Sequence, residues 1–200
     1  MRSSMLVLSI ACLMAICFVN CQQPATDVEE SAAEAEGMSA AEQVARGAYL
    51  VNTMGCDDCH TPKVMGEMGP EPDMTRRFMG HPAGTELPDY DPAWVAPGQW
   101  YLANNDLTGW VGPWGISYSA NISSDATGIG SWTEEHFIRA IREGLYKGLE
   151  GSRPLLPPMP WPQYRQLTDE DLKAIFAFLQ TTEPQNNVVP PAVVAGPPPG

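Results

Sequence analysis

Cys56-Asp57-Asp58-Cys59-His60, a C-x-x-C-H run, constrains the structure of this chain more than any other segment. Its two cysteines stand three positions apart, so that both thiols lie on one helical turn with the imidazole of His60 next to them. This spacing is typical of covalent haem attachment, in which the thiols bond two vinyl groups and the histidine ligates the iron. The run therefore predicts one haem c, held by Cys56 and Cys59, with His60 as the proximal iron ligand.

Three other interpretations of the two cysteines are weaker. A zinc site needs about two further ligands, and no cysteine follows Cys59. His60 with His81 or His136 could complete a site, but a ligand directly adjacent to the second cysteine is awkward for a tetrahedron. A thioredoxin-type pair should follow a strand, whereas a helix is predicted before this pair. A disulfide between the two cysteines would close too small a loop to stabilise much.

The composition limits the class of protein and its partners. The chain has 200 residues and a formal net charge of −13, which suits one domain with accessory segments. An acidic surface repels nucleic acid and anionic lipid head groups, so neither is an expected partner. It suits a redox partner protein with a basic docking face.

The N-terminal segment predicts export. Residues 1–20 read as a signal peptide, because an uncharged run from Met5 to Val19 is shorter than the ~20 apolar residues of a spanning helix. Cys21 follows it directly, as in a bacterial lipoprotein signal, although Phe18-Val19-Asn20 departs from the usual pattern. We expect Cys21 to be lipidated and to tether the protein on the periplasmic side of a membrane. An ordinary cleaved signal and an uncleaved anchor remain alternatives.

Three helices are predicted in the rest of the chain. Ser39-x-x-Glu42 is a capping box that opens a helix ending near Met54-Gly55. A second helix runs from about Thr133 to Glu143, and a third from Thr168 to about Gln180. Residues 63–120 are rich in Gly, Pro and Trp without strong strand alternation, and predict a long irregular insertion that wraps the cofactor. The expected fold class is therefore all-α, with about three main helices around one covalently bound haem.

These patterns divide the chain into four parts. Residues 21–38 are acidic and predict a flexible linker, and residues 39–183 form the cofactor-binding domain. Residues 184–200 are rich in proline and predict a disordered tail.

Met159 is the strongest candidate for the distal iron ligand. Pro157-Pro158-Met159-Pro160-Trp161 places prolines on both sides of the methionine, which stiffens the backbone and can hold a thioether in a fixed position. His81 and His136 are rival ligands, and Met159 as a loop filler is the other alternative.

Residues 39–183 resemble class I c-type cytochromes in the order helix, C-x-x-C-H, long loop, helix, methionine segment and C-terminal helix. Gly47 looks like the small residue at which the C-terminal helix of that family crosses closely, here through Phe176 and Phe178. Three stretches are similar to haem domains in cytochrome subunits of membrane-bound dehydrogenases: Gly55–Lys63, Asn121–Ser123 with Thr127–Gly130, and Pro158–Trp161. Those subunits carry several haem motifs, whereas this chain has one.

The resemblance implies a function as well as a fold. It implies His60 and Met159 as axial ligands and haem packing near Trp161 and Tyr164. Histidine–methionine ligation fills both axial positions, so we expect single-electron transfer, not catalysis, between a dehydrogenase and a terminal oxidase or reductase. A haem catalyst or gas sensor is the alternative if Met159 does not ligate the iron. A non-catalytic subunit whose Trp-rich loop is an interface is a third hypothesis.

Overall fold

The structure is a computed structural model, and it describes residues 38–196. The predicted signal peptide, Cys21 and nearly all of the predicted linker lie outside the described residues, as do residues 197–200. Everything described belongs to one compact unit, Gly37–Gly200. Within residues 38–196, no helix combines the length and the apolar character that crossing a membrane requires.

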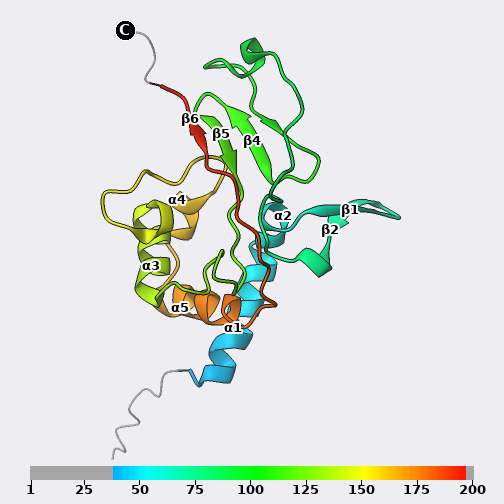
Figure 1. Ribbon diagram of the computed structural model, residues 1–200. Helices are drawn as coiled ribbons and strands as arrows, with labels where there is room; N and C mark the ends of the chain where they lie inside the picture. The colour runs from blue at the N-terminus through cyan, green and yellow to red at the C-terminus, as the bar shows by residue number, and fades with distance from the viewer. Residues whose placement is uncertain (1–37, 197–200) are drawn as a thin grey trace, which may run out of the picture. The chain divides into compact units, whose positions relative to one another are not determined.

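The described part contains five α-helices and six short strands, joined by long irregular segments (Figure 1). The helices are α1 (Ala40–Thr53), α2 (Cys56–His60), α3 (Glu134–Glu143), α4 (Trp161–Tyr164) and α5 (Asp169–Leu179). The strands are β1 (Lys63–Gly66), β2 (Gly69–Pro72), β3 (Leu102–Ala103), β4 (Gly109–Gly112), β5 (Gly115–Tyr118) and β6 (Val193–Val194). Three 3₁₀ turns complete the set: η1 (Met74–Arg76), η2 (Pro92–Val95) and η3 (Tyr146–Gly148).

The three predicted helices are confirmed, together with the residues that begin them. The Ser39 hydroxyl accepts from the Glu42 amide, and the Glu42 carboxylate accepts from the Ser39 amide at 2.9 Å, which closes the capping box of α1. Thr133 caps α3 and Thr168 caps α5 in the same way, each through its side-chain oxygen. These caps satisfy amides that have no partner inside the helix.

Helices α1 and α5 cross at Gly47, as predicted. A Cβ atom at Gly47 would lie 1.9 Å from the Ala174 carbonyl oxygen and 2.7 Å from the Phe178 Cβ, so only glycine allows this approach. Phe178 makes the close contact at Gly47, whereas the Phe176 ring lies tilted against that of Phe137 in α3, with the ring centroids 5.5 Å apart. The buried core lies where the helices meet and consists of Leu50, Val51, Phe78, Ile129, Phe137, Ile141, Leu172, Ile175 and Leu179.

The prediction of an all-α fold is wrong. Helices account for 34% and strands for 14% of the described residues, so the fold is mixed. Strands β1 and β2 form an antiparallel hairpin, and β3, β4, β5 and β6 form an antiparallel sheet in that order. The sequence does not reveal these strands because each is at most four residues long, too short for an alternating pattern to show.

The segment after α5 also differs from the predicted disordered tail. As far as residue 196 it is extended, and β6 pairs with β5. The buried Asn187 holds this segment in place: its amide nitrogen donates to the carbonyls of Met79 and His81, and its amide oxygen accepts from the Ala83 N–H at 2.8 Å. One polar side chain therefore ties the C-terminal segment to the insertion, a contact that proline content does not reveal.

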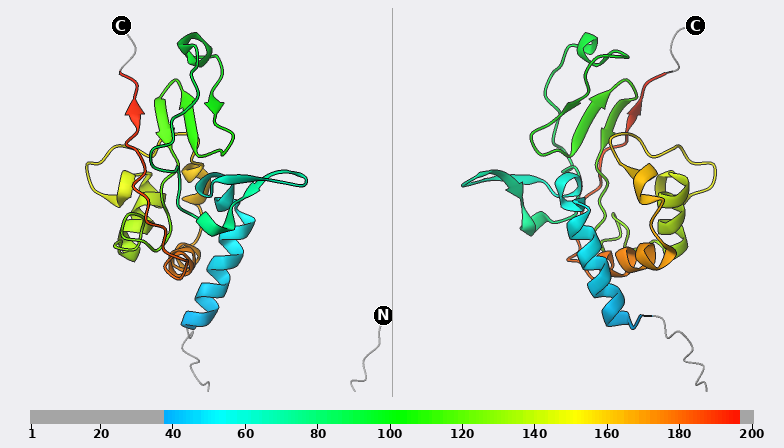
Figure 2. Two further views of the ribbon diagram at one scale, coloured as in Figure 1. Left: turned by 45° about the vertical axis from the view of Figure 1, so that its right-hand side comes forward. Right: turned by 180° about the vertical axis from the view of Figure 1, so that it is seen from behind.

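The helices and the four-stranded sheet lie toward opposite ends of this unit, with α2 between them (Figure 1). Figure 2 shows the β1–β2 hairpin extending away from the rest of the unit on the side of α2. The C-x-x-C-H run is thus flanked by the helical core and by the insertion.

Candidate haem site

The C-x-x-C-H run forms α2, a single short helix that begins at a left-handed glycine. Gly55 has φ of 70°, which lets the chain leave α1 and start α2 at once. Cys56 and Cys59 are both half-buried and are not bonded to each other. The structure therefore presents two free thiols from one turn, immediately followed by His60.

The second residue of the run is held by an ion pair. Arg77 contacts both carboxylate oxygens of Asp57, with an Nη2 to Oδ2 distance of 2.7 Å, and also donates to Asn52. The guanidinium lies over the Phe78 ring, 4.3 Å from its centroid. Thr61 donates to Asp57 at 2.7 Å, which ties the end of α2 to its start.

Lys63 stabilises the other end of α2. Its ammonium group donates to the carbonyls of Asp57, Asp58 and Thr61 at 2.5–3.1 Å. A cation at the C-terminal end of a helix supplies donors to carbonyls that have no partner inside it. Contacts within the protein alone therefore fix the orientation of α2 at both of its ends.

His60 is prepared for metal ligation through its Nε2 atom. Its Nδ1 lies 2.7 Å from the Ala120 carbonyl oxygen. Because a carbonyl can only accept, Nδ1 carries the proton and the lone pair is on Nε2. Desolvation lowers the pKa of His60, which keeps the ring in the neutral form that binds metals.

The loop that follows Ala120 holds that carbonyl in position. The side-chain oxygen of Asn121 accepts from the Ser123 amide, and its nitrogen donates to the Gln185 carbonyl at 2.7 Å. A Cβ atom at Gly128 would lie 2.6 Å from the Asn121 side-chain oxygen, so glycine is required there. This is one of the stretches that resembles dehydrogenase cytochrome subunits in the sequence.

The two thiols are not tuned as a redox pair. Burial raises the pKa of Cys56 to about 12, with Asp57 as the next contribution. Burial also raises the pKa of Cys59. Reactive C-x-x-C pairs have a lowered cysteine pKa, so this environment does not fit the thioredoxin interpretation.

The ring nitrogens of the rival His81 are not available to the iron. His81 is fully buried, with Nε2 donating to the Thr85 carbonyl at 3.1 Å and Nδ1 accepting from the Thr108 hydroxyl at 2.9 Å. Both ring nitrogens are therefore used. His136 lies in the first turn of α3, where its amide donates to Thr133.

The methionine strap, residues 157–161, is held by the insertion. The Ser117 hydroxyl donates to the Pro157 carbonyl at 2.6 Å and accepts from the Trp114 indole N–H at 3.1 Å. Met159 is half-buried and packs against the helical core. The strap is thus positioned both by β5 and by the core.

The two predicted packing residues lie in α4, directly after the strap. The Tyr164 hydroxyl donates to the Met54 carbonyl at 3.1 Å, which brings α4 next to the turn that precedes Cys56. Burial raises the pKa of Tyr164, and the two cysteine sulfurs contribute to the shift. The Trp161 ring packs against Gly144, where a Cβ atom would lie 2.5 Å from the ring. The structure therefore brings Tyr164 to the C-x-x-C-H run and places Trp161 at the end of α3.

Sequence analysis missed three residues that support the site: Arg77, Ser117 and Ala120. Ala120 acts through a backbone carbonyl, which no residue type reveals, although its position directly before Asn121 is a usable signal. Arg77 and Ser117 act across long sequence separations from Asp57 and Pro157. Such pairings depend on the tertiary fold.

The donor set fits a covalently attached haem. Two free thiols from one turn, a neutral imidazole with an available Nε2, and a half-buried thioether are the groups that such a cofactor requires. Within residues 38–196, no three His, Cys, Asp or Glu side chains gather as a metal site. The ligand set of a zinc site is therefore not assembled in the part of the chain that the structure describes.

Comparison with known proteins identifies the family. The cytochrome c family model matches residues 44–183, well over half of the chain. A stretch of 70 residues is 43% identical to the fructose dehydrogenase cytochrome subunit of Gluconobacter japonicus, covering 34% of this chain and 14% of that protein. A stretch of 67 residues is 42% identical to the gluconate 2-dehydrogenase cytochrome c subunit of Pantoea cypripedii, covering 33% and 14%.

A third relative is the cytochrome c subunit of a quinone alcohol dehydrogenase of Gluconobacter oxydans, 42% identical over 67 residues, which are 33% of this chain and 13% of that protein. The matched part is only a small fraction of each of these relatives. The family match, in contrast, covers most of α1, the other two predicted helices, the C-x-x-C-H run and the methionine strap. The chain therefore belongs to the cytochrome c family, whose members carry covalently bound haem c and transfer electrons.

Proposed function

We propose that this protein carries single electrons through one haem, bonded to Cys56 and Cys59 and ligated by His60 and Met159. The observation that carries the proposal is the hydrogen bond from His60 Nδ1 to the Ala120 carbonyl at 2.7 Å. It leaves Nε2 available next to two free thiols. One haem is proposed because the sequence holds a single C-x-x-C-H run.

The chain's own groups perform three tasks in this proposal. Cys56 and Cys59 would hold the haem through two thioether bonds, formed when each thiol adds to one vinyl group without a leaving group. His60 and Met159 would supply the two protein ligands to its iron, which would exclude substrate from the metal and favour outer-sphere transfer. When bound, the haem supplies a reversible one-electron couple. Trp161 and Tyr164 are proposed to pack near it, Tyr164 through its place beside the C-x-x-C-H run.

We further propose a setting for the electron transfer. The relatives are named as cytochrome subunits of fructose, alcohol and gluconate dehydrogenases, so a dehydrogenase is the proposed electron donor, with a terminal oxidase or reductase as acceptor. The cytochrome c domain is proposed to span residues 39–183. Export to the periplasmic side through residues 1–20 and lipidation of Cys21 would tether it at a membrane, with residues 21–38 as linker.

The test is a chemical analysis of the protein matured in a host that attaches haem c. We expect the colour to survive denaturing extraction, and the peptide that contains residues 56–60 to gain the mass of one haem. Met159→Ala should abolish the absorption band of methionine-ligated ferric haem and allow carbon monoxide to bind the reduced protein promptly. A colourless protein after extraction would refute the proposal, and prompt carbon monoxide binding by the unaltered protein would favour a sensor or catalyst.

A further inference from the structure

An unusual group of exposed aromatic side chains lies on the insertion, far along the chain from the haem motif. Trp94, Trp100 and Tyr101 are 54%, 72% and 60% exposed. The Trp100 amide donates to the Trp94 carbonyl at 2.9 Å, which brings the two tryptophans close together. Together the two tryptophans expose on the order of 300 Å², which is within the range of the largest apolar patch on a typical monomer. We name Trp94 and Trp100 the aromatic face, whereas Tyr101 packs against Trp110 and Trp114.

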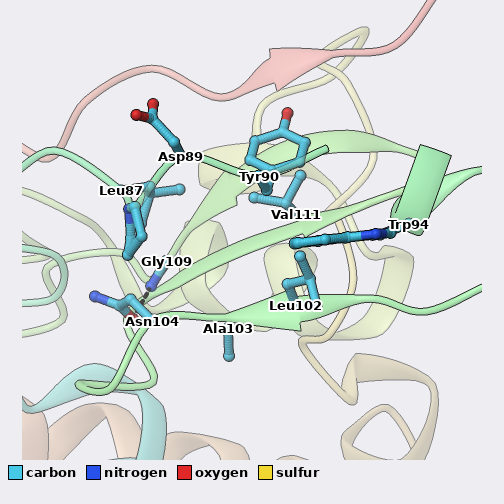
Figure 3. Close-up of a pocket in the computed structure, with 10 residues that line it drawn as sticks. Leu87, Asp89, Tyr90, Trp94, Leu102, Ala103, Asn104, Gly109 and Val111 are labelled. Carbon is cyan, nitrogen blue, oxygen red and sulfur yellow. Dashed lines mark hydrogen bonds between the residues drawn. The ribbon is translucent and has the colours of Figure 1, made fainter. Parts of the chain in front are cut away.

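A hollow of about 160 Å³ lies beside this face. Trp94, Tyr90, Leu102 and Val111 converge on it, and Asp89 lies at its edge (Figure 3). A cavity of roughly 150 Å³ accommodates a benzene-sized group, so the hollow can take one large side chain from another molecule. Buried anchors of this kind, in a pocket with aromatic walls, carry most of the energy in protein interfaces.

The hollow is surrounded by negative charge, which limits the kind of group that can bind in it. The sequence has no lysine or arginine between Arg77 and Arg139. Glu86, Asp89 and Asp91 are exposed, and none of them belongs to an ion pair formed within residues 38–196. The segment around the hollow therefore carries negative charge, with no basic residue of its own and no ion pair at these three carboxylates.

This charge argues against several occupants at once. A second copy of the chain carries the same net charge of −13 and is repelled, as are anionic lipid surfaces and nucleic acid. A basic protein segment is attracted instead. An arginine or lysine side chain also matches the hollow, because its aliphatic stem packs on apolar walls and its cation interacts with aromatic rings.

We propose that the aromatic face is the docking surface for a partner protein that presents a basic segment, with an arginine or lysine side chain inserted in the hollow next to Asp89. The inference deepens the proposed function, since the partner it describes is the redox partner. Only the statement that the partner exchanges electrons rests on the proposed function. The statement that a basic segment binds here rests on the side chains and charges of the aromatic face and the hollow.

The first test measures binding of a defined probe to the ¹⁵N-labelled reduced holoprotein. The probe is the peptide Gly-Gly-Arg-Leu-Arg-Gly-Gly, and its counterpart has glutamate in place of both arginines. We expect the arginine peptide to shift the indole N–H signals of Trp94 and Trp100 in a saturable way, and the glutamate peptide to leave them unchanged. Equal shifts with both peptides, or no saturable shift with either, would overturn the proposal.

Matched variants distinguish binding at the aromatic face from non-specific attraction of the peptide to an acidic protein. Asp89→Asn with Asp91→Asn should weaken binding of the arginine peptide about three- to tenfold. Asp91 caps η2 by accepting from the Ala93 amide, and an asparagine oxygen can do the same. The control is Glu67→Gln, an exposed carboxylate on the β1–β2 hairpin. Trp94→Ala should weaken binding at least about fivefold, and the control Tyr49→Ala, 59% exposed on α1, should not. An equal loss in the controls would contradict the assignment.

The second test places a photo-crosslinking benzoyl-phenylalanine at position 100 or at position 49 of the full chain in its native host. We expect position 100 to give an adduct whose partner peptide, sequenced by mass spectrometry, contains lysine or arginine. The yield of that adduct should fall when Asp89 and Asp91 are both replaced by asparagine. An adduct with a second copy of the chain, or equal adducts from both positions, would overturn the proposal. If the matured protein holds no haem, only the proposed function is refuted, because the peptide titration can be run on that protein as it is and reads the indole signals of Trp94 and Trp100.

Discussion

Ser117→Ala is expected to loosen the methionine strap while leaving the haem attached. In the structure the Ser117 hydroxyl donates to the Pro157 carbonyl at 2.6 Å and accepts from the Trp114 indole at 3.1 Å. Alanine removes both hydrogen bonds, each worth about 1 kcal/mol, and leaves two partly buried groups without a partner, so the strap should be destabilised by about 1–3 kcal/mol. If Met159 ligates the iron, that energy opposes its replacement by an added ligand.

The assay is an imidazole titration of the oxidised protein, followed through the absorption band of methionine-ligated haem. A destabilisation of about 1–3 kcal/mol corresponds to a rise in imidazole affinity of up to about 5- to 150-fold. Ser117→Thr keeps the hydroxyl and should restore most of the affinity of the unaltered protein.

Ser124→Ala is the matched control for this titration. Its hydroxyl also donates to a backbone carbonyl, that of Thr182 at 2.5 Å, but it lies outside the strap. We expect the control to lower the thermal midpoint without changing imidazole affinity. If Ser117→Ala and Ser124→Ala bind imidazole with the same affinity as the unaltered protein, then Ser117 does not hold the strap.

Three further changes test other parts of the structure. Gly47→Ala should destabilise the protein by about 1–3 kcal/mol in urea unfolding, because its Cβ would lie 1.9 Å from the Ala174 carbonyl; the open Gly196→Ala should be neutral. Arg77→Met should cost about 2 kcal/mol by leaving Asp57 without its ion pair, and a change within about 0.5 kcal/mol would contradict that role. Hydrogen bonds from the Thr127 hydroxyl and amide lower the pKa of Asp125, so the stability it adds is present above about pH 4, its unfolded pKa, and is lost as the pH falls through the lower folded value. The difference in thermal midpoint between the unaltered protein and Asp125→Asn should therefore shrink toward pH 2, and a constant difference would refute the linkage.

The helices were predictable from sequence because local chemistry determines their ends. Ser39, Thr133 and Thr168 each supply a side-chain oxygen to an amide three residues later, and Gly144 ends α3 in a left-handed conformation with φ of 67°. Each of these interactions depends on residues that are neighbours in sequence. Their free energy does not depend on where the rest of the chain lies.

The strands and the C-terminal segment were not predictable because residues distant in the sequence stabilise them. Strand β4 has glycine at both ends, and Gly115 begins β5 with φ of 101°, so the pattern resembles a turn-rich loop. Their stability comes from pairing with each other and with β6, which lies more than 70 positions later. The residue types of the candidate site could be predicted from the C-x-x-C-H spacing and the prolines around Met159. Their hydrogen-bond partners could not, because those partners are set by the same long-range pairing.

The insertion does more than cover the cofactor, because one short segment of it contacts His60 and also the strap that bears Met159. Ser117 in β5 holds the strap that bears Met159, and the Ala120 carbonyl just after β5 orients His60. The two anchors are three positions apart in the chain, and β6 pairs with the same strand at Gly115 and Ile116. A displacement of β5 must act on both ligands together, whereas a change at the crossing of α1 and α5 acts on the helical core. The sheet that carries the aromatic face on its loops is thus joined, through β5, to the two groups proposed to hold the iron. Binding of a partner at that face and the ligation of the iron share one structural element.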